Sequence, residues 1–282
     1  MGKGNFILGT GSSSIGDVTF ARRNGQQIAR VRVRKIKNPK SYGQAEQRMY
    51  MSPVTKFYSP LAKVLETSFE GLSKADSYAK FISVNANLAR ANGWAVNKGS
   101  NIIPLPYQLS NGTLGRVDPE KQGLLISTSA FTGTTIGDLS TTLKSKYPSL
   151  ENGDQVTIIV FAHNNADQSG VFTNITLSYA RFFINTQSTD TIADSEVKVV
   201  NNTDYYLIPK SVSGLQSVFA AGIIVSRFEN NAWRRSPAFM VCDSSFVALH
   251  TGADNLTAAI ASYMKSAGVT PISDVYLNGS DD

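Results

Sequence analysis

The sequence predicts a β-rich α+β protein with a basic N-terminal arm at residues 1–40, a helical segment at 41–99 and a body at 100–282. Three observations predict this class. An Asn-Gly pair between two alternating segments indicates a β-hairpin in the arm. Apolar residues then recur at helical spacing from Val54 to Leu88. Segments rich in β-branched and aromatic residues follow, which favours a β-sandwich or jelly-roll-like body with two short helices.

The arm is predicted to form a hairpin around the turn Asn24-Gly25. This turn sets a register in which Val18 faces Val31 and Thr19 faces Arg30. Side chains alternate between the faces of a strand, so one face collects Val18, Phe20, Ala29, Val31 and Val33. The opposite face collects Asp17, Thr19, Ala21, Ile28, Arg30, Arg32 and Arg34. An isolated hairpin is marginally stable. Its apolar face therefore needs cover from the chain's own helices or from a neighbouring subunit, and we favour the neighbour.

The positive charge is concentrated in the arm. Residues 1–48 hold ten Lys and Arg against two acids, a net charge of +8, while the whole chain is +6 and residues 49–282 therefore sum to −2. Such an arm is typical of contact with nucleic acid or another polyanion. Two other interpretations of this charge are open. Charge on an edge hairpin prevents aggregation, and a basic arm can dock on an acidic patch of a neighbouring subunit. The arm's candidate nucleic-acid-binding residues are Arg22, Arg23, Arg30, Arg32, Arg34, Lys35, Lys37 and Lys40.

Residues 1–15 are rich in Gly and Ser, which predicts a flexible segment or one ordered by a partner. The start of the chain lacks the apolar core of a signal peptide, so secretion by that route is not expected. No apolar run approaches the length of about 18 residues that a membrane helix needs. We therefore expect a protein without a membrane partner.

Three helices are predicted in the helical segment, over residues 41–52, 59–70 and 73–91. Pro53 is expected to end or kink the first helix. Ser59 and Pro60 form the start signal of the second. The third begins at Ser73 and ends before Gly93.

The body is predicted to consist mainly of strands. They run over Ile102–Ser110, Gly123–Ser129, Gln155–His163, Val171–Asn185, Glu196–Val200, Tyr205–Ile208, Ser217–Phe228 and Trp233–Cys242. The continuous apolar run from Thr157 to Ala162 predicts a central strand. A tight turn at Glu229-Asn230-Asn231 predicts a second hairpin, and Pro237 indicates an edge or a bulge. Two short helices are expected in the body. One is capped by Thr135 and runs over Ile136–Lys146, and the other is capped by Asp254 and runs to about Ala267.

No catalytic, metal or cofactor motif is present, so an enzyme is not expected. Cys242 is the single cysteine, which excludes an intramolecular disulfide. A further hypothesis is an enzyme in which Cys242 and His250 form a nucleophilic pair. It requires the two side chains to lie within hydrogen-bond reach of each other. A lone cysteine at the end of an apolar strand usually belongs to the core. The other histidine, His163, has Asp167 near it in sequence.

A second candidate nucleic-acid site follows the predicted turn of the second hairpin, at Trp233, Arg234 and Arg235. An aromatic ring can stack on a base while arginines hold phosphate. The same pattern also occurs as an exposed edge with a half-buried tryptophan. The segment 178–183 carries a similar but weaker pattern of aromatic residues around one arginine.

The opening of the chain resembles the start of an uncharacterised family found in Bacteroidota genomes and their phages. Members begin with Met-Gly-Lys, a Gly-rich turn, a short β-hairpin, a basic Pro-containing linker and a Gln/Arg-rich helix start. The corresponding segments here are Met1-Gly2-Lys3, Gly9-Thr10-Gly11, Gly16–Ile36, Asn38-Pro39-Lys40 and Gln44–Arg48. The segment SVFAAGIIVSRFENNAWRRSPAFMV resembles the family's closing hairpin. The resemblance implies a helical segment, a β-sandwich-like C-terminal part and no known activity, and its phage association favours a structural protein.

The sequence together with this resemblance favours a non-enzymatic structural protein, a phage capsid or virion-associated subunit that is located in a virion or in the host cytoplasm. We expect a homo-oligomer or larger assembly whose arm contacts nucleic acid or a neighbouring subunit. The alternative is a soluble nucleic-acid-binding protein without sequence preference, which uses the arm together with Trp233, Arg234 and Arg235.

Overall fold

The computed structural model describes residues 3–5, 10–15, 18–23, 26–31, 41–93, 105–119, 125–127, 131–163, 175–201, 205–212 and 218–242, together with residues 244, 247, 257, 258, 260 and 261. The chain divides into two compact units, residues 1–41 and residues 42–282. The larger unit combines helices with antiparallel sheets, which confirms the predicted β-rich α+β class.

The smaller unit is an antiparallel meander with the strand order β1-β2-β3-β4. Its strands are β1 (Lys3–Asn5), β2 (Thr10–Ile15), β3 (Val18–Arg23) and β4 (Gln26–Val31). Val18 pairs with Val31 and Arg23 pairs with Gln26, as the turn chemistry predicted. The predicted flexibility before residue 16 is wrong for the described residues, because β2 pairs with both β1 and β3.

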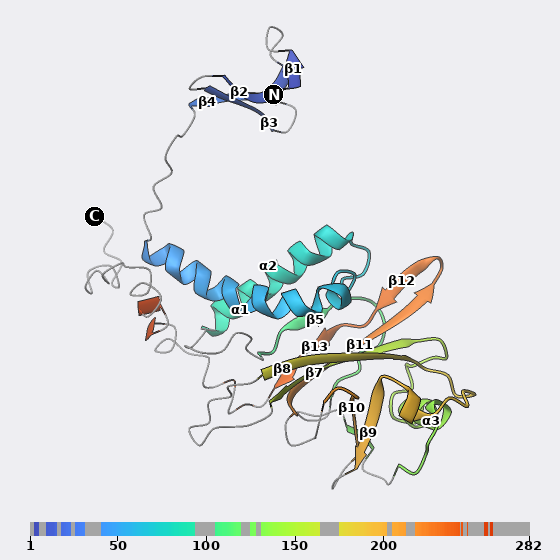
Figure 1. The fold of residues 1–282 in the computed structure, drawn as a ribbon. Coiled ribbons are helices and arrows are strands. Elements are labelled where there is room, and N and C mark those ends of the chain that lie inside the picture. Colours follow the sequence, from blue (N-terminus) through green and yellow to red (C-terminus); the bar gives the residue numbers. More distant parts are fainter. Residues whose placement is uncertain are drawn as a thin grey trace. The chain divides into compact units, whose positions relative to one another are not determined.

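Two helices form the helical segment, α1 (Tyr42–Leu65) and α2 (Lys74–Asn92), and Figure 1 shows them side by side. α1 passes through both Pro53 and Pro60, so a helix end at Pro53 and a second helix start at Ser59 are wrong. A proline inside a helix removes one backbone hydrogen bond. Val54, Phe57 and Leu61 are nevertheless fully buried, and their burial compensates for the lost bonds.

The boundaries predicted for the third helix are confirmed in α2. The Ser73 side chain accepts a hydrogen bond from the backbone N–H of Asp76, which is the geometry of an N-cap. At the other end Gly93 adopts a left-handed conformation with φ of 59°, and its N–H bonds back to the last turn.

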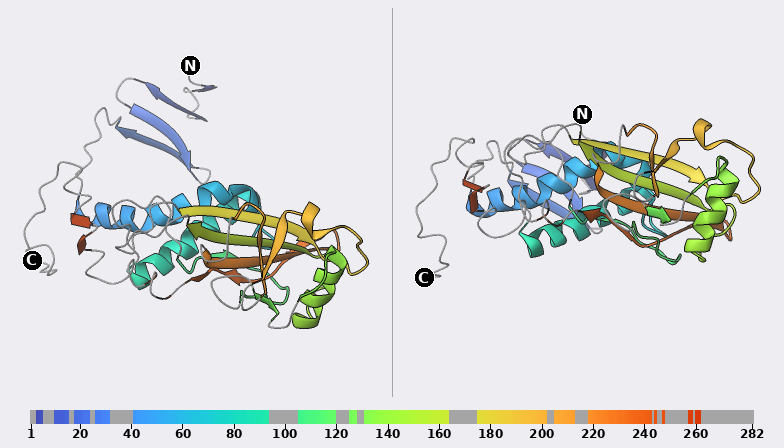
Figure 2. Two further views of the ribbon diagram at one scale, coloured as in Figure 1. Left: turned by 60° about the horizontal axis from the view of Figure 1, so that its bottom comes forward. Right: turned by 90° about the horizontal axis from the view of Figure 1, so that it is seen from below.

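The larger unit is built on an antiparallel sheet with the order β12-β11-β7-β8, in which β14 also pairs with β11. Its strands are β7 (Gln155–His163), β8 (Ile175–Phe183), β11 (Val218–Glu229), β12 (Ala232–Arg235) and β14 (Val241–Cys242). Figures 1 and 2 show β8, β7 and β11 side by side. β7 lies between two partners, which confirms the predicted central strand. The predicted strand after Trp233 is interrupted around Pro237.

Smaller elements complete this unit. One is a small sheet with the order β6-β10-β9, formed by β6 (Leu125–Ser127), β9 (Val197–Asn201) and β10 (Tyr205–Pro209). Another is the strand pair β5 (Gln108–Ser110) and β13 (Ala238–Phe239). The helices are α3 (Ile136–Lys146) and the short helix η2 (Ile192–Asp194). α3 begins after Thr135, as predicted, and Thr135 forms a capping box with Asp138. The helix expected after Asp254 lies largely outside the described residues.

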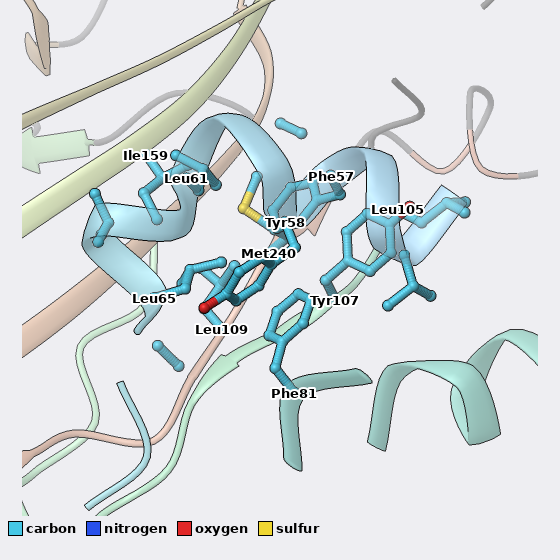
Figure 3. Close-up of a cluster of buried hydrophobic side chains, with 14 of the residues drawn as sticks. Phe57, Tyr58, Leu61, Leu65, Phe81, Leu105, Tyr107, Leu109, Ile159 and Met240 are labelled. Atoms are coloured by element: carbon cyan, nitrogen blue, oxygen red, sulfur yellow. The ribbon is translucent and has the colours of Figure 1, made fainter. Parts of the chain in front are cut away.

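A hydrophobic core lies on each face of the central sheet. On one face, side chains of α1 and α2 pack against Ile159 and Phe161 of β7. Phe57 stacks on Tyr107 there, with ring centroids 4.2 Å apart (Figure 3). On the other face, α3 and the small sheet pack against Ile158 and Val160 (Figure 1). The helices and strands of residues 42–282 therefore share one compact unit.

Candidate interaction surfaces

The N-terminal sheet exposes an apolar pair. Val18 and Val31 face each other across β3 and β4, and their exposed fractions are 37% and 75%. Arg30, which precedes Val31 in β4 and lies on the opposite face of the sheet, is also exposed. Of the other residues predicted to bind nucleic acid, Arg22 and Arg23 lie on β3, whereas Arg32, Arg34, Lys35, Lys37 and Lys40 lie outside the described residues. The described part of the arm therefore carries an apolar pair on one face and an exposed cation on the other.

The β11–β12 hairpin carries an aromatic pair at its tip. Asn230 and Asn231 have φ angles of 50° and 60°, and two successive positive φ angles define the type I′ turn that joins adjacent antiparallel strands. Phe228 pairs with Trp233 in the ladder. Their rings meet edge to face, with centroids 5.4 Å apart, and remain 58% and 44% exposed. Sequence reasoning noted Trp233 but missed Phe228, although a two-residue turn places the two opposite each other.

Arg235 is buried, with an exposed fraction of 7%. Its Nε donates to the Thr67 carbonyl oxygen over 2.9 Å, and its Nη2 donates to Thr67 Oγ1 over 3.2 Å. Burial lowers the pKa of the Arg235 guanidinium to about 10, and the nearby charge of Arg181 acts in the same direction. We therefore reassign Arg235 from phosphate contact to a structural role that holds the hairpin against the chain that follows α1.

Arg234 is also engaged within the protein. Its Nη1 donates to Glu70 Oε1 over 2.9 Å. The Glu70 carboxylate also accepts backbone hydrogen bonds from Thr113 and Arg235, over 2.9 Å and 3.1 Å. Burial raises the pKa of Glu70, but these hydrogen bonds outweigh it, and the pKa lies below its ordinary value of 4.5. Glu70 already pairs with the Arg234 charge, so Arg234 too receives a structural role.

A second ion-pair cluster holds the base of the hairpin from the other side. The Arg227 guanidinium donates to Oδ1 and Oδ2 of Asp154 over 2.7 Å and 2.9 Å, and it also pairs with Glu151. Its Nη2 donates to the Ser149 carbonyl oxygen over 2.9 Å. The hairpin is thus anchored both to the segment between α1 and α2 and to the segment that precedes β7.

The described residues contain no group of three or more His, Cys, Asp or Glu arranged to hold a metal ion. Cys242 is half-buried and packs against the core beneath α1. His250 lies outside the described residues, so the Cys242–His250 pair stays a prediction. Over the part of the chain that the structure describes, no helix is long and apolar enough to cross a membrane.

Comparison of the sequence and the structure with protein-family models, curated proteins and solved structures found no match. The functional inference therefore depends on the two exposed surfaces, the Val18–Val31 pair and the Phe228–Trp233 pair.

Proposed function

We propose that this chain is a non-enzymatic structural subunit of a homo-oligomer or larger assembly, a capsid or virion-associated protein. Its N-terminal sheet contacts a neighbouring subunit or nucleic acid. The observation that carries the proposal is the exposed pair of Val18 and Val31. Exposed apolar residues that lie side by side on a small sheet favour association, because covering them removes apolar surface from water.

The distribution of charge supports the same proposal. Residues 1–41 hold nine Lys and Arg against one acid, a net charge of +8, and residues 42–282 hold 18 against 20, a net charge of −2. Copies that present a basic arm and a slightly acidic body attract each other through unlike charges. The resemblance of the opening segment to a phage-associated family supports the virion assignment.

The proposal is tested by size-exclusion chromatography with light scattering on the purified full chain. We expect a species larger than a monomer and a lower mass after Val31→Asp, which places a charge in the apolar pair. Leu72→Asp is the matched control, since Leu72 is 42% exposed on the larger unit, and this variant should keep the wild-type mass. A monomeric full chain at every concentration contradicts the proposal.

The second candidate function is binding of nucleic acid without sequence preference, which the exposed Arg30 and the charge of the arm support. Phosphate contacts release counterions, so affinity should fall steeply between about 50 and 200 mM salt. A gel-shift titration of the full chain and of Arg30→Gln measures this. A monomer or dimer that shifts DNA, with weaker binding by Arg30→Gln, favours this candidate over the structural subunit.

A further inference from the structure

The tip of the β11–β12 hairpin extends past the neighbouring strand of the sheet. β7 begins at Gln155, which pairs with Ser226, so Phe228 and its partner Trp233 lie beyond the first residue of β7. Their rings are therefore presented without a flanking strand on the β7 side. Exposed large apolar side chains that lie together mark interaction sites. Tryptophan is also among the residues that contribute most to binding energy at interfaces.

The tip is rigid because its base is fixed twice. Arg227 binds the buried carboxylate of Asp154 on one side, and Arg235 binds Thr67 on the other. The asparagine turn fixes the hairpin's end in a conformation that suits the twist of the strands. A rigid pair of aromatic side chains loses little conformational entropy on binding, which favours a docking role.

The charge of the tip selects the kind of partner. Residues 228–233 include one acid, the exposed Glu229, and no Lys or Arg. The arginines on either side, Arg227 and Arg234, are engaged with Asp154 and Glu70. A polyanion would meet a negative charge here, so nucleic acid is disfavoured. The partner surface that complements the hairpin tip is therefore apolar and belongs to a basic part of a protein.

We infer that the Phe228–Trp233 pair docks against the N-terminal sheet of a second copy of this chain. That sheet exposes Val18 and Val31 side by side, in a unit with a net charge of +8. The aromatic rings cover the valines, and the attraction between the basic arm of one copy and the slightly acidic body of the other favours the encounter. The inference rests on the proposed function, because it names the surface that the arm contacts in the neighbouring subunit.

The contact joins two different surfaces, the hairpin tip of one molecule and the N-terminal sheet of the next. Each copy therefore donates one surface and accepts through the other. A head-to-tail contact of this kind generates a ring when the rotation closes and an open chain when it does not. Two copies that exchange these surfaces form a closed dimer, and longer series form larger rings or open chains.

The test is cysteine cross-linking between two full-length variants, Val31→Cys and Trp233→Cys, mixed in equal amounts under mild oxidation. Each variant lacks the other's new cysteine, so a 31–233 link forms only between molecules. Native Cys242 is retained, and mass spectrometry identifies the linked peptides. Leu72→Cys replaces Trp233→Cys in the control mixture, because Leu72 and Trp233 have similar exposed fractions, 42% and 44%.

We expect the 31–233 link to be several times more abundant than the 31–72 link. Light scattering on the same samples separates the two possible failures. An assembly without an excess of the 31–233 link overturns the inference and leaves the proposed function standing, whereas a monomer overturns both. Phe228→Cys takes the place of Trp233→Cys if circular dichroism shows that the latter has not folded.

Discussion

The Arg227 guanidinium binds the completely buried carboxylate of Asp154 with two hydrogen bonds, of 2.7 Å and 2.9 Å. Removing one partner of a buried pair leaves the other charge without compensation. We therefore expect Arg227→Met to lower the free energy of unfolding by about 3–5 kcal/mol. Urea unfolding monitored by circular dichroism measures this change.

Arg116→Met is the control for Arg227→Met. Arg116 pairs with Asp118 over 2.7 Å, but both side chains are largely exposed. Exposed pairs contribute about 0–1 kcal/mol, so this variant should unfold close to the wild-type midpoint. Equal losses for the two variants would show that the Arg227–Asp154 pair contributes no more than a surface pair.

Glu70 should make the stability of the protein sensitive to acid. Its folded pKa lies below the ordinary value of 4.5, because hydrogen bonds to the carboxylate outweigh the effect of burial. A depressed folded pKa stabilises the protein fully above the unfolded pKa, and this contribution is lost as the pH falls through the folded value. The wild type should therefore lose stability as the pH drops below 4.5, and Glu70→Gln should lose less over that range.

The comparison needs urea midpoints at about pH 7 and about pH 3 for both proteins. Glu66→Gln serves as the control, since Glu66 makes one exposed ion pair, with Lys74. A Glu70→Gln variant with the same loss of stability as the wild type between these pH values would contradict the assignment.

Local sequence signals predicted much of the fold because their causes are local. The Asn24-Gly25 turn predicted the pairing of Val18 with Val31, and that register is confirmed. The capping residues Ser73 and Thr135 predicted the starts of α2 and α3. Each signal acts within a few residues of the chain, where backbone geometry and hydrogen bonding decide the outcome.

Contacts between distant segments could not be predicted in the same way. Arg235 and Thr67 lie 168 residues apart, and nothing in either segment indicates their hydrogen bond. The sequence therefore presented Arg235 as a free cation. The pairing of Asp154 with Arg227 of β11 is likewise remote, since the two residues lie 73 positions apart. Pro53 was expected to interrupt a helix, but tertiary burial of neighbouring side chains overrides that local preference.

Asn85 should contribute to stability through hydrogen bonds rather than through apolar contact. It is fully buried on α2. Its Nδ2 donates to the carbonyl oxygens of Phe81 and Gln108, each over 3.0 Å, and its Oδ1 accepts from the Gln108 N–H over 2.8 Å. Asn85→Ala leaves the backbone groups of Gln108 without these partners, at a cost of about 1–3 kcal/mol.

Chemical denaturation of Asn85→Ala and Asn87→Ala separates this role from helix propensity. Asn87 is exposed on the same helix, and both substitutions replace asparagine by a better helix former. We expect Asn87→Ala to be neutral or slightly stabilising. A neutral Asn85→Ala would mean that the link to Gln108 contributes nothing.

Pro60 offers the opposite test, since its replacement should stabilise the protein. It is exposed within α1 and supplies no N–H to the carbonyl group of Lys56, four residues earlier. An interior proline costs a helix about 3 kcal/mol, and the lower entropy of the unfolded chain offsets about 0.4–1 kcal/mol of this. Pro60→Ala should therefore raise the free energy of unfolding by about 2 kcal/mol, measured by urea unfolding.

Pro53→Ala provides the comparison for Pro60→Ala. Pro53 is buried, so its replacement restores a backbone donor but also removes side-chain packing, and the gain should be smaller. A loss of stability in Pro60→Ala would indicate that the proline sets the direction of the last turns of α1. Leu61 and Leu65 follow it there and are buried in the core beneath the helix. In that case the proline would be retained because it positions these two leucines, although it weakens the helix locally.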